Sequence, residues 1–171
     1  MKSDTSPFNI AILGCGTVGG GVARIVLDLQ DSLKRKARRP IILHSIVDLF
    51  PQKAAERHNI PRSCFCGNGA ELDAAQAAAE ISRILDDPEI DLVVETIGGT
   101  SASLRAVCTR ILENGKHLVT ANKALLAEFG EPLFAIAEDG DSSLAYEAAV
   151  CGAIPVIRTL REGFAGDEVE S

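Results

Sequence analysis

A glycine-rich segment near the N-terminus could hold a phosphate-bearing ligand. Gly14, Gly16 and Gly19 are spaced as G-x-G-x-x-G, after an apolar run that predicts a strand and before a helical pattern. In that setting the first glycine allows a tight turn, the second lets the backbone approach a pyrophosphate, and the third lets the helix pack on the strand. The helix N-terminus supplies amides to the phosphates. The segment, including Thr17 and Val18, therefore predicts a dinucleotide site.

Asp48 follows the second predicted strand, where an acidic side chain normally binds the hydroxyls of the adenosine ribose. A carboxylate in that position repels a 2′-phosphate and so favours NAD over NADP. Lys53 or Arg57 could reverse this preference by reaching the phosphate. The alternative for Asp48 is a role as a turn or helix-capping residue.

Lys123 follows another predicted strand, and ligands bind at the carboxyl ends of strands in sheets of this kind. It would also open a helix, where a cation is electrostatically unfavourable. That unfavourable position favours a functional lysine over a merely solvated one.

The elements that must position these residues alternate along the chain. Strands are expected at residues 8–13, 41–47, 91–95, 117–121 and 143–147, with a short additional strand at 63–66. Helices are expected at residues 19–38, 52–58, 70–85, 101–115, 123–139 with a break near Gly130, and 153–163. This order predicts an α/β fold with a Rossmann-type, doubly wound parallel sheet.

Composition narrows the class of protein. The 171 residues suffice for one domain with a sizeable core, and 46% of them are hydrophobic. A net charge of -7 argues against nucleic-acid or membrane-surface partners. The N-terminus lacks a secretory signal, and no apolar run approaches the roughly 20 residues of a membrane helix.

Cysteine usage indicates a reducing compartment. Five cysteines at irregular spacing predict free thiols and a cytoplasmic protein. Cys15, inside the glycine loop, could be a reactive thiol stabilised by the helix N-terminus. A small side chain packed in the turn is the favoured interpretation.

Three later segments are more specific than the glycine loop. They are residues 94–99 (VETIGG), 115–127 (GKHLVTANKALLA) and 146–157 (YEAAVCGAIPVI). Together with Gly16–Gly19 they resemble the homoserine dehydrogenase family, and residues 160–167 look like that family entering its second domain. The resemblance implies an NAD(P)-binding Rossmann domain at residues 1–150 and the truncated start of a substrate and dimerisation domain at 151–171.

The resemblance also implies a reaction. It is the NAD(P)-dependent interconversion of L-homoserine and L-aspartate 4-semialdehyde, in the biosynthesis of threonine, methionine and isoleucine. Lys123 would lie near the nicotinamide and the substrate, where its ammonium group can help to polarise or position the carbonyl. The full-length enzyme would be a homodimer, and the present chain alone would bind cofactor without turning over homoserine.

Other site residues follow from the same resemblance. Thr96, Ile97 and Gly98 look like the segment beside the nicotinamide-side ribose, and Asn122 is expected to hold that loop through its side chain. A further set matches a segment whose backbone carbonyls bind a monovalent cation such as sodium, an ordinary turn being the alternative; its members are Glu147, Val150, Gly152 and Ile154.

Some alternatives stay open. Val47 stands where many NADP-using members carry an arginine, so the choice between NAD and NADP is unresolved. A sugar or inositol dehydrogenase would share the architecture, but the sequence Asn122-Lys123-Ala124 differs from the Glu-Lys-Pro context expected there. A non-catalytic NAD-binding module would need neither the lysine nor a second domain.

Overall fold

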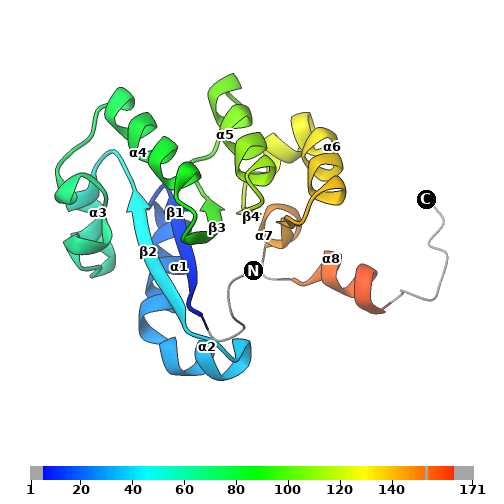
Figure 1. Cartoon of the computed structure of the whole chain (residues 1–171), viewed down its shortest axis with the longest axis horizontal. Coiled ribbons are helices and arrows are strands. Elements are labelled where there is room, and N and C mark those ends of the chain that lie inside the picture. Colours follow the sequence, from blue (N-terminus) through cyan, green and yellow to red (C-terminus); the bar gives the residue numbers. More distant parts are fainter. Residues whose placement is uncertain (1–5, 153, 164–171) are drawn as a thin grey trace.

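A five-stranded parallel sheet forms the centre of the computed structural model, which describes residues 6–152 and 154–163 (Figure 1). The strand order is β2-β1-β3-β4-β5, and every neighbouring pair is parallel. The strands are β1 (Phe8–Leu13), β2 (Ile41–Val47), β3 (Ile90–Glu95), β4 (His117–Thr120) and β5 (Leu144–Ala145). The chain winds outward from β1 to β2 and then back past β1 to β3. The doubly wound sheet predicted from the sequence is therefore confirmed, with its switch point between β1 and β3.

Helices cover both faces of the sheet, which explains why its strands are apolar runs rather than alternating patterns. The helices are α1 (Thr17–Asp28), α2 (Gln30–Ala37), α3 (Pro51–His58), α4 (Ala74–Asp86), α5 (Ala102–Glu113), α6 (Lys123–Asp139), α7 (Glu147–Val150) and α8 (Val156–Arg158). Leu13 and Val93 pack into the cluster that includes α4, α5 and α6. Ile12 and Val94 point the opposite way, toward α1 and α3.

Local signals explain where several helices begin and end. The Ser101 hydroxyl accepts a hydrogen bond from the amide of Leu104 and caps α5, as predicted. Helix α6 leaves helical geometry at Phe129 (φ -142°), beside the predicted break. Helix α4 begins at residue 74 rather than 70, because Asp73 forms a capping box with Gln76.

Two predicted elements are wrong in extent. The single helix expected at residues 19–38 is two helices, because Leu29 leaves the helical region (φ -110°, ψ 24°). Helix α2 buries no residue, so packing does not force it to continue the axis of α1. The last helix is shorter than predicted, since Pro155 precedes α8 and a π-helical turn follows at Thr159–Gly163. Its expected first residue, Ala153, lies outside the described residues.

The outer strands are also shorter than predicted. The strand expected at 63–66 is replaced by a 3₁₀ turn at Arg62–Cys64, and only Phe65 bridges to Ile46 on the outer side of β2. In the six-stranded Rossmann order 3-2-1-4-5-6, the third strand in sequence lies beside the second, on the outer side. Here the single bridge from Phe65 takes that position beside β2. The strand expected at 143–147 is reduced to β5, because α7 begins at Glu147.

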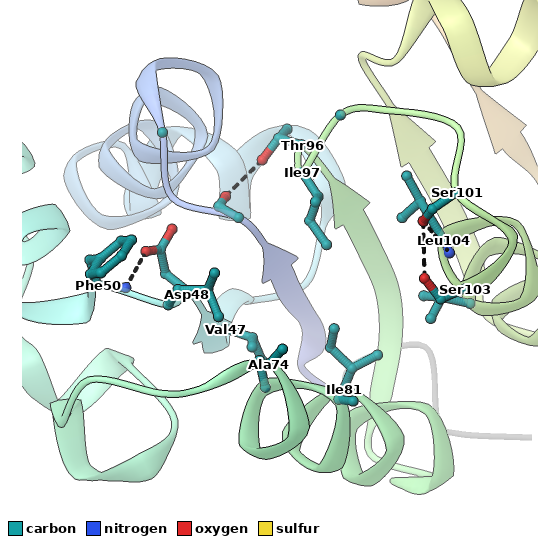
Figure 2. Close-up of a pocket in the computed structure, with 17 residues that line it drawn as sticks. Val47, Asp48, Phe50, Ala74, Ile81, Thr96, Ile97, Ser101, Ser103 and Leu104 are labelled. Atoms are coloured by element: carbon teal, nitrogen blue, oxygen red, sulfur yellow. Dashed lines mark hydrogen bonds between the residues drawn. The ribbon is translucent and has the colours of Figure 1, made fainter.

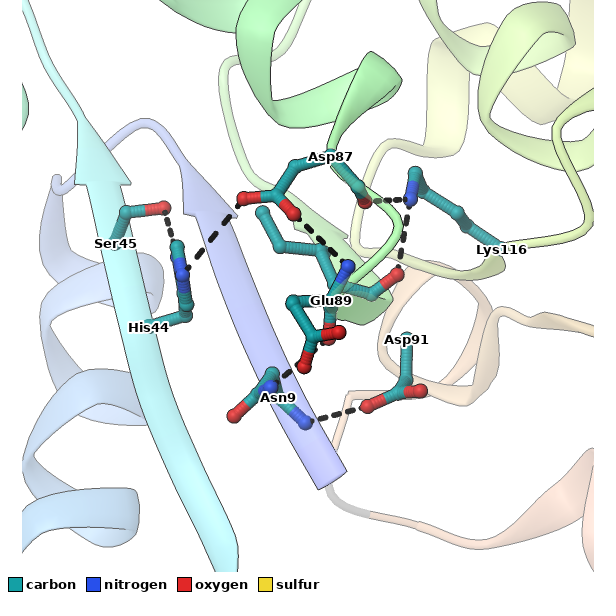
Figure 3. A network of polar contacts seen from close by, with 8 residues as sticks. Asn9, His44, Ser45, Asp87, Glu89, Asp91 and Lys116 are labelled. Atoms are coloured by element: carbon teal, nitrogen blue, oxygen red, sulfur yellow. Dashed lines mark hydrogen bonds and ion pairs between the residues drawn. The ribbon is translucent and has the colours of Figure 1, made fainter. Parts of the chain in front are cut away.

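A polar network joins the amino ends of the strands (Figure 3). The buried Lys116 ammonium donates to the carbonyls of Asp87, at 2.5 Å, and Ile90, at 3.0 Å. The backbone amide of Asn9 donates to the Asp91 carboxylate at 2.7 Å. These contacts fix the turn before β3, at the edge of the sheet opposite the glycine loop.

Among the helices that the structure describes, none is both long and apolar enough to cross a membrane.

Candidate functional site

A cleft of about 520 Å³ opens at the carboxyl edge of the sheet, at the switch point (Figure 2). Its walls come from the loops after β1, β2 and β3 and from α4 and α5. Helix α4 contributes small and apolar side chains, including Ala74, Ala77 and Ile81. Ile97 projects into the cleft from the loop after β3. The cleft therefore lies where an open α/β sheet of this topology binds its ligand.

Each glycine of the G-x-G-x-x-G segment has a different local reason. Gly14 turns the chain with a positive φ of 86°, and a Cβ there would lie 3.0 Å from the Thr96 carbonyl oxygen and 3.1 Å from the Ile97 amide nitrogen. A Cβ on Gly19 would lie 2.6 Å from the Thr96 hydroxyl and closer still to the Gly14 carbonyl, so only glycine fits. Gly16 lines the cleft, and a Cβ there would meet no atom within 4 Å. This open space is what the close approach of a phosphate requires.

The N-terminus of α1 is prepared for an anion. Gly16 is its N-cap, no side chain caps the helix, and its first turn contains no acidic residue. The first amides of the helix, those of Thr17 and Val18 among them, therefore have no capping side chain to satisfy them. Together with the positive end of the helix dipole, they suit a pyrophosphate.

Asp48 serves the fold as well as lining the cleft. One carboxylate oxygen accepts a hydrogen bond from the amide of Cys15 at 2.6 Å, and the other accepts from the amide of Phe50 at 2.8 Å. The turn role considered from the sequence is thus observed, and the same side chain ties β2 to the glycine loop. Each oxygen can accept a further hydrogen bond, so a ribose contact stays a prediction.

Neither Lys53 nor Arg57 is among the residues that line the cleft. The Lys53 ammonium lies over the Phe50 ring, 4.7 Å from its centroid, and Arg57 is exposed on α3. Among the described residues that line the cleft, Asp48 is the one that carries a charge. The electrostatic character of the wall is therefore set by a carboxylate.

The loop after β3, which contains Thr96, Ile97 and Gly98, lies along the cleft. The Thr96 hydroxyl donates to the carbonyl of Gly14 at 2.7 Å, so this side chain faces the glycine loop. Ile97 is 51% exposed, and Gly98 has a positive φ of 82°. Contact between these residues and a ribose stays a prediction.

Asn122 holds the loop after β3, as predicted. Its side-chain amide donates to the carbonyl of Gly99 at 2.7 Å, and its side-chain oxygen accepts from the amide of Leu125. The second contact caps α6, whose first residue is the exposed Lys123. Lys123 is not among the residues that line the cleft, so its catalytic role stays a prediction.

Sequence reasoning missed Glu95 and Thr120, the last residues of β3 and β4. Both are completely buried, and the Thr120 hydroxyl donates to the Glu95 carboxylate at 2.6 Å. A carboxylate that directly follows the apolar run 92–94 was the available signal. A buried charge without hydrogen-bond partners would be costly.

The cysteines are free thiols, as predicted. Cys15 is 3% exposed. Burial, as the larger cause, and the nearby charge of Asp48, as the smaller one, raise the pKa of its thiol to about 11. The thiol is therefore protonated at neutral pH, and packing rather than reactivity describes Cys15.

The segment expected to bind sodium is a helical turn followed by irregular backbone. The Glu147 carboxylate accepts hydrogen bonds from the amides of Ile157 and Arg158, the last two residues of α8. The carbonyl of Ile154 accepts from the amide of Val156 at 2.8 Å. Cation binding by the backbone of this segment stays a prediction.

The sequence and fold match one family throughout. A family model described as the NAD-binding domain of homoserine dehydrogenase matches residues 14–147. The chain belongs to the homoserine dehydrogenase family. A homoserine dehydrogenase of Neisseria gonorrhoeae is 41% identical over 165 residues, which are 96% of this chain and 34% of that protein. One from Pseudomonas aeruginosa is 40% identical over 95% of this chain and 34% of that protein.

Solved structures of the homoserine dehydrogenase family agree with the fold. The structure from Thiobacillus denitrificans has a TM-score of 0.78 and 35% identity, and the match covers 97% of this chain and 35% of that one. A structure from S. aureus has a TM-score of 0.64 and 28% identity over 85% of this chain and 33% of that one. The chain thus spans about a third of the length of these relatives and corresponds to their NAD-binding part.

Proposed function

We propose that this chain binds NAD(H) in the cleft at the switch point. The pyrophosphate is held by the backbone of Gly16 and the first amides of α1, and the ribose hydroxyls of the adenosine half donate to Asp48. The nicotinamide half extends along Thr96, Ile97 and Gly98. The observation that supports this most directly is the open space at Gly16, beside a helix N-terminus that no side chain caps.

The cofactor preference in this proposal is for NAD(H) over NADP(H). Asp48 is the one charged residue among the described residues lining the cleft, and a carboxylate repels a 2′-phosphate. Val47, where an arginine would supply a positive charge, is a buried apolar side chain. The Lys53 ammonium lies over the Phe50 ring, and Lys53 is not itself one of the residues that line the cleft.

Calorimetric titration of the 171-residue chain with NADH and then NADPH tests both points. The expected result is one site per chain, with NADH bound about 10-fold or more tightly than NADPH. A preference for NADPH would reject the role of Asp48 and point to Lys53 or Arg57. Binding of neither cofactor would reject the proposal for this chain.

For the whole protein, the proposed reaction is the interconversion of L-homoserine and L-aspartate 4-semialdehyde. When bound, the nicotinamide accepts or supplies the hydride. Lys123, at the carboxyl end of β4 beside the loop after β3, places its ammonium group to stabilise charge that develops on the substrate oxygen. The substrate-binding acids and the proton donor belong to the remaining two thirds of the relatives' length.

Steady-state kinetics of the full-length protein test this reaction. Lys123→Met is expected to lower kcat for homoserine oxidation by about 100-fold, the scale of losing one electrostatic stabiliser. Lys36→Met, which removes an equivalent charge from an exposed position on α2, serves as the matched control and should retain the wild-type rate. The 171-residue chain alone should show no homoserine-dependent rate, and a measurable rate would reject this division of labour.

Four further features belong to the same proposal. The full-length protein is cytoplasmic and forms a homodimer. Residues 151–171 begin its substrate and dimerisation domain, with 164–171 outside the described residues. The backbone of a short segment binds sodium, through Glu147, Val150, Gly152 and Ile154.

Two observations favour this enzyme over the alternatives. Family membership supports it over a sugar or inositol dehydrogenase. The position of Lys123 supports it over a non-catalytic NAD-binding module.

A further inference from the structure

The loops after β3 and β4 are joined by a closed ring of hydrogen bonds around Glu95. One oxygen of this completely buried carboxylate accepts from the amides of Ile97, at 2.8 Å, and Gly98, at 3.0 Å. The other oxygen accepts from the Thr120 hydroxyl at 2.6 Å. Glu95 thus binds its own loop with one oxygen and the end of the neighbouring strand with the other.

The ring continues through Asn122 and returns to the first loop. The Thr120 hydroxyl oxygen accepts from the amide of Asn122 at 3.0 Å. The side chain of Asn122 then donates to the carbonyl of Gly99 at 2.7 Å, in the loop that Glu95 also holds. The loop is therefore fixed through its amides at one end and a carbonyl at the other, and Lys123 follows Asn122 directly.

The backbone of this loop requires such support. Gly98 and Gly99 both have positive φ values, 82° and 83°, and a Cβ at either would meet no atom within 4 Å. Two consecutive glycines with open surroundings have many accessible conformations. The hydrogen bonds to Glu95 and Asn122 select one of them, in which Ile97 and Gly98 line the cleft.

Glu95 is completely buried and is not one of the residues that line the cleft. Direct contact with a cofactor is therefore not its role. The thiol of Cys108, equally buried on α5, has a pKa raised to about 12 by its burial and then by the charge of Glu95. The Glu95 charge therefore acts on a thiol in the core behind the loop after β3.

We propose that Glu95 is a positioning residue: through Ile97, Gly98 and the Thr120–Asn122 link, it sets the loop after β3 and the start of α6 in one geometry for the nicotinamide half of the cofactor. This role rests on the proposed binding of NAD(H). The glycine loop, which holds the adenosine and pyrophosphate half, has anchors that do not involve Glu95: the Val47 carbonyl, the Asp48 carboxylate and the Thr96 hydroxyl. Glu95 therefore affects the two halves of the cofactor unequally.

The test compares NADH with ADP-ribose, which lacks the nicotinamide, by calorimetry on the 171-residue chain. Glu95→Gln keeps the shape but cannot accept from the two loop amides and from the Thr120 hydroxyl at once. We expect it to weaken NADH binding about 10-fold and to leave ADP-ribose binding within about twofold. Circular dichroism and thermal unfolding confirm that the variant is folded under the conditions of the titration.

A second pair of variants breaks the ring without touching Glu95. Thr120→Val preserves the shape but loses the hydroxyl, whereas Thr120→Ser keeps the hydroxyl. Thr120→Val should reproduce the selective loss of NADH affinity, and Thr120→Ser should restore it. If Glu95 and Thr120 had a merely structural role, Glu95→Gln and Thr120→Val would lower thermal stability but would change the affinities for NADH and ADP-ribose by the same factor.

The outcomes separate this role from the proposed function. If the wild-type chain binds NADH and ADP-ribose but Glu95→Gln and Thr120→Val change both affinities equally, or neither, the positioning role is overturned while the cofactor site stands. If the wild-type chain binds neither ligand, the proposed function is overturned and the role of Glu95 falls with it.

Discussion

Replacing three neighbouring glycines by alanine, one at a time, separates the cofactor site from the fold. Gly16, Gly19 and Gly21 lie within six residues of one another, but their surroundings differ sharply. An added Cβ meets nothing within 4 Å at Gly16 or Gly21, whereas at Gly19 it meets the Gly14 carbonyl and the Thr96 hydroxyl. Gly16 faces the cleft, while Gly21 lies inside α1 and outside the cleft lining.

The expected stabilities follow from these contacts. Gly19→Ala pushes a methyl group against backbone that cannot retreat easily, and overpacking of this kind costs about 1–3 kcal/mol. For a domain of this size, each kcal/mol lowers Tm by about 2–4 °C. Gly21→Ala should raise stability by about 0.5–1 kcal/mol, because alanine is the better helix residue. Gly16→Ala should cost about 0.5–1 kcal/mol, because alanine is a poorer N-cap residue than glycine.

Cofactor affinity should follow a different order. Gly16→Ala puts a methyl group into the space through which the pyrophosphate reaches the backbone, so NADH affinity should fall by about 10-fold or more, or about 1.4 kcal/mol. Gly21→Ala, the matched control, should bind NADH as the wild type does. Gly19→Ala should lose both affinity and stability, because α1 and the glycine loop have to move apart.

Thermal unfolding followed by circular dichroism gives the stabilities, and calorimetric titration at a temperature where all variants are folded gives the affinities. Wild-type affinity for NADH in Gly16→Ala would refute the assignment of the pyrophosphate to this loop. Wild-type stability in Gly19→Ala would refute the close packing of helix and strand described here.

Three other predictions follow from single side chains. Asp48→Asn should weaken NADH binding about 10-fold, because the ribose hydroxyls lose a charged acceptor, and should weaken NADPH binding less, because the repulsion of the 2′-phosphate is also removed. Calorimetry with both cofactors measures the ratio of the two affinities, and an unchanged ratio would contradict the ribose contact. Because the pKa of Cys15 is raised to about 11, only about one thiol in a thousand is ionised at pH 8; mass spectrometry after iodoacetamide treatment should find the exposed Cys151 labelled first, and equal labelling of both would contradict this burial. Lys116→Met should cost about 1–3 kcal/mol in urea unfolding, because one buried and one part-buried carbonyl lose their donor. NADH affinity should be unchanged, because the site is at the opposite edge of the sheet.

Much of the fold was predictable because its signals are local. The strand-glycine-helix order of the first unit and the Ser101 cap each depend on residues close together in the chain. The role of Asn122 in holding a loop 23 residues away was predicted from the family resemblance instead. The local signals fixed the strand edge at which the site forms. They could not fix lengths: the helical periodicity runs through Leu29 unbroken although the backbone does not.

Site residues were predictable where a residue type at a given position has one common role, as for the glycines of the G-x-G-x-x-G segment. They were less predictable where a side chain can have several roles. Asp48 was identified as a ribose ligand or a turn residue, and the structure shows that its carboxylate joins β2 to the glycine loop across 33 residues. Glu95 and Thr120 were missed because their meaning arises only when two strands distant in sequence are paired. The spacing of residues along the chain does not predict such a contact.

An NMR titration of the isotope-labelled chain with NADH tests most directly whether the cofactor occupies the cleft at the switch point. Binding should be saturable, with the largest amide shifts at Gly16, Thr17 and Val18 and further shifts at Ile97 and Gly98. Saturable shifts that cluster elsewhere, or no shifts at all, would contradict binding in this cleft.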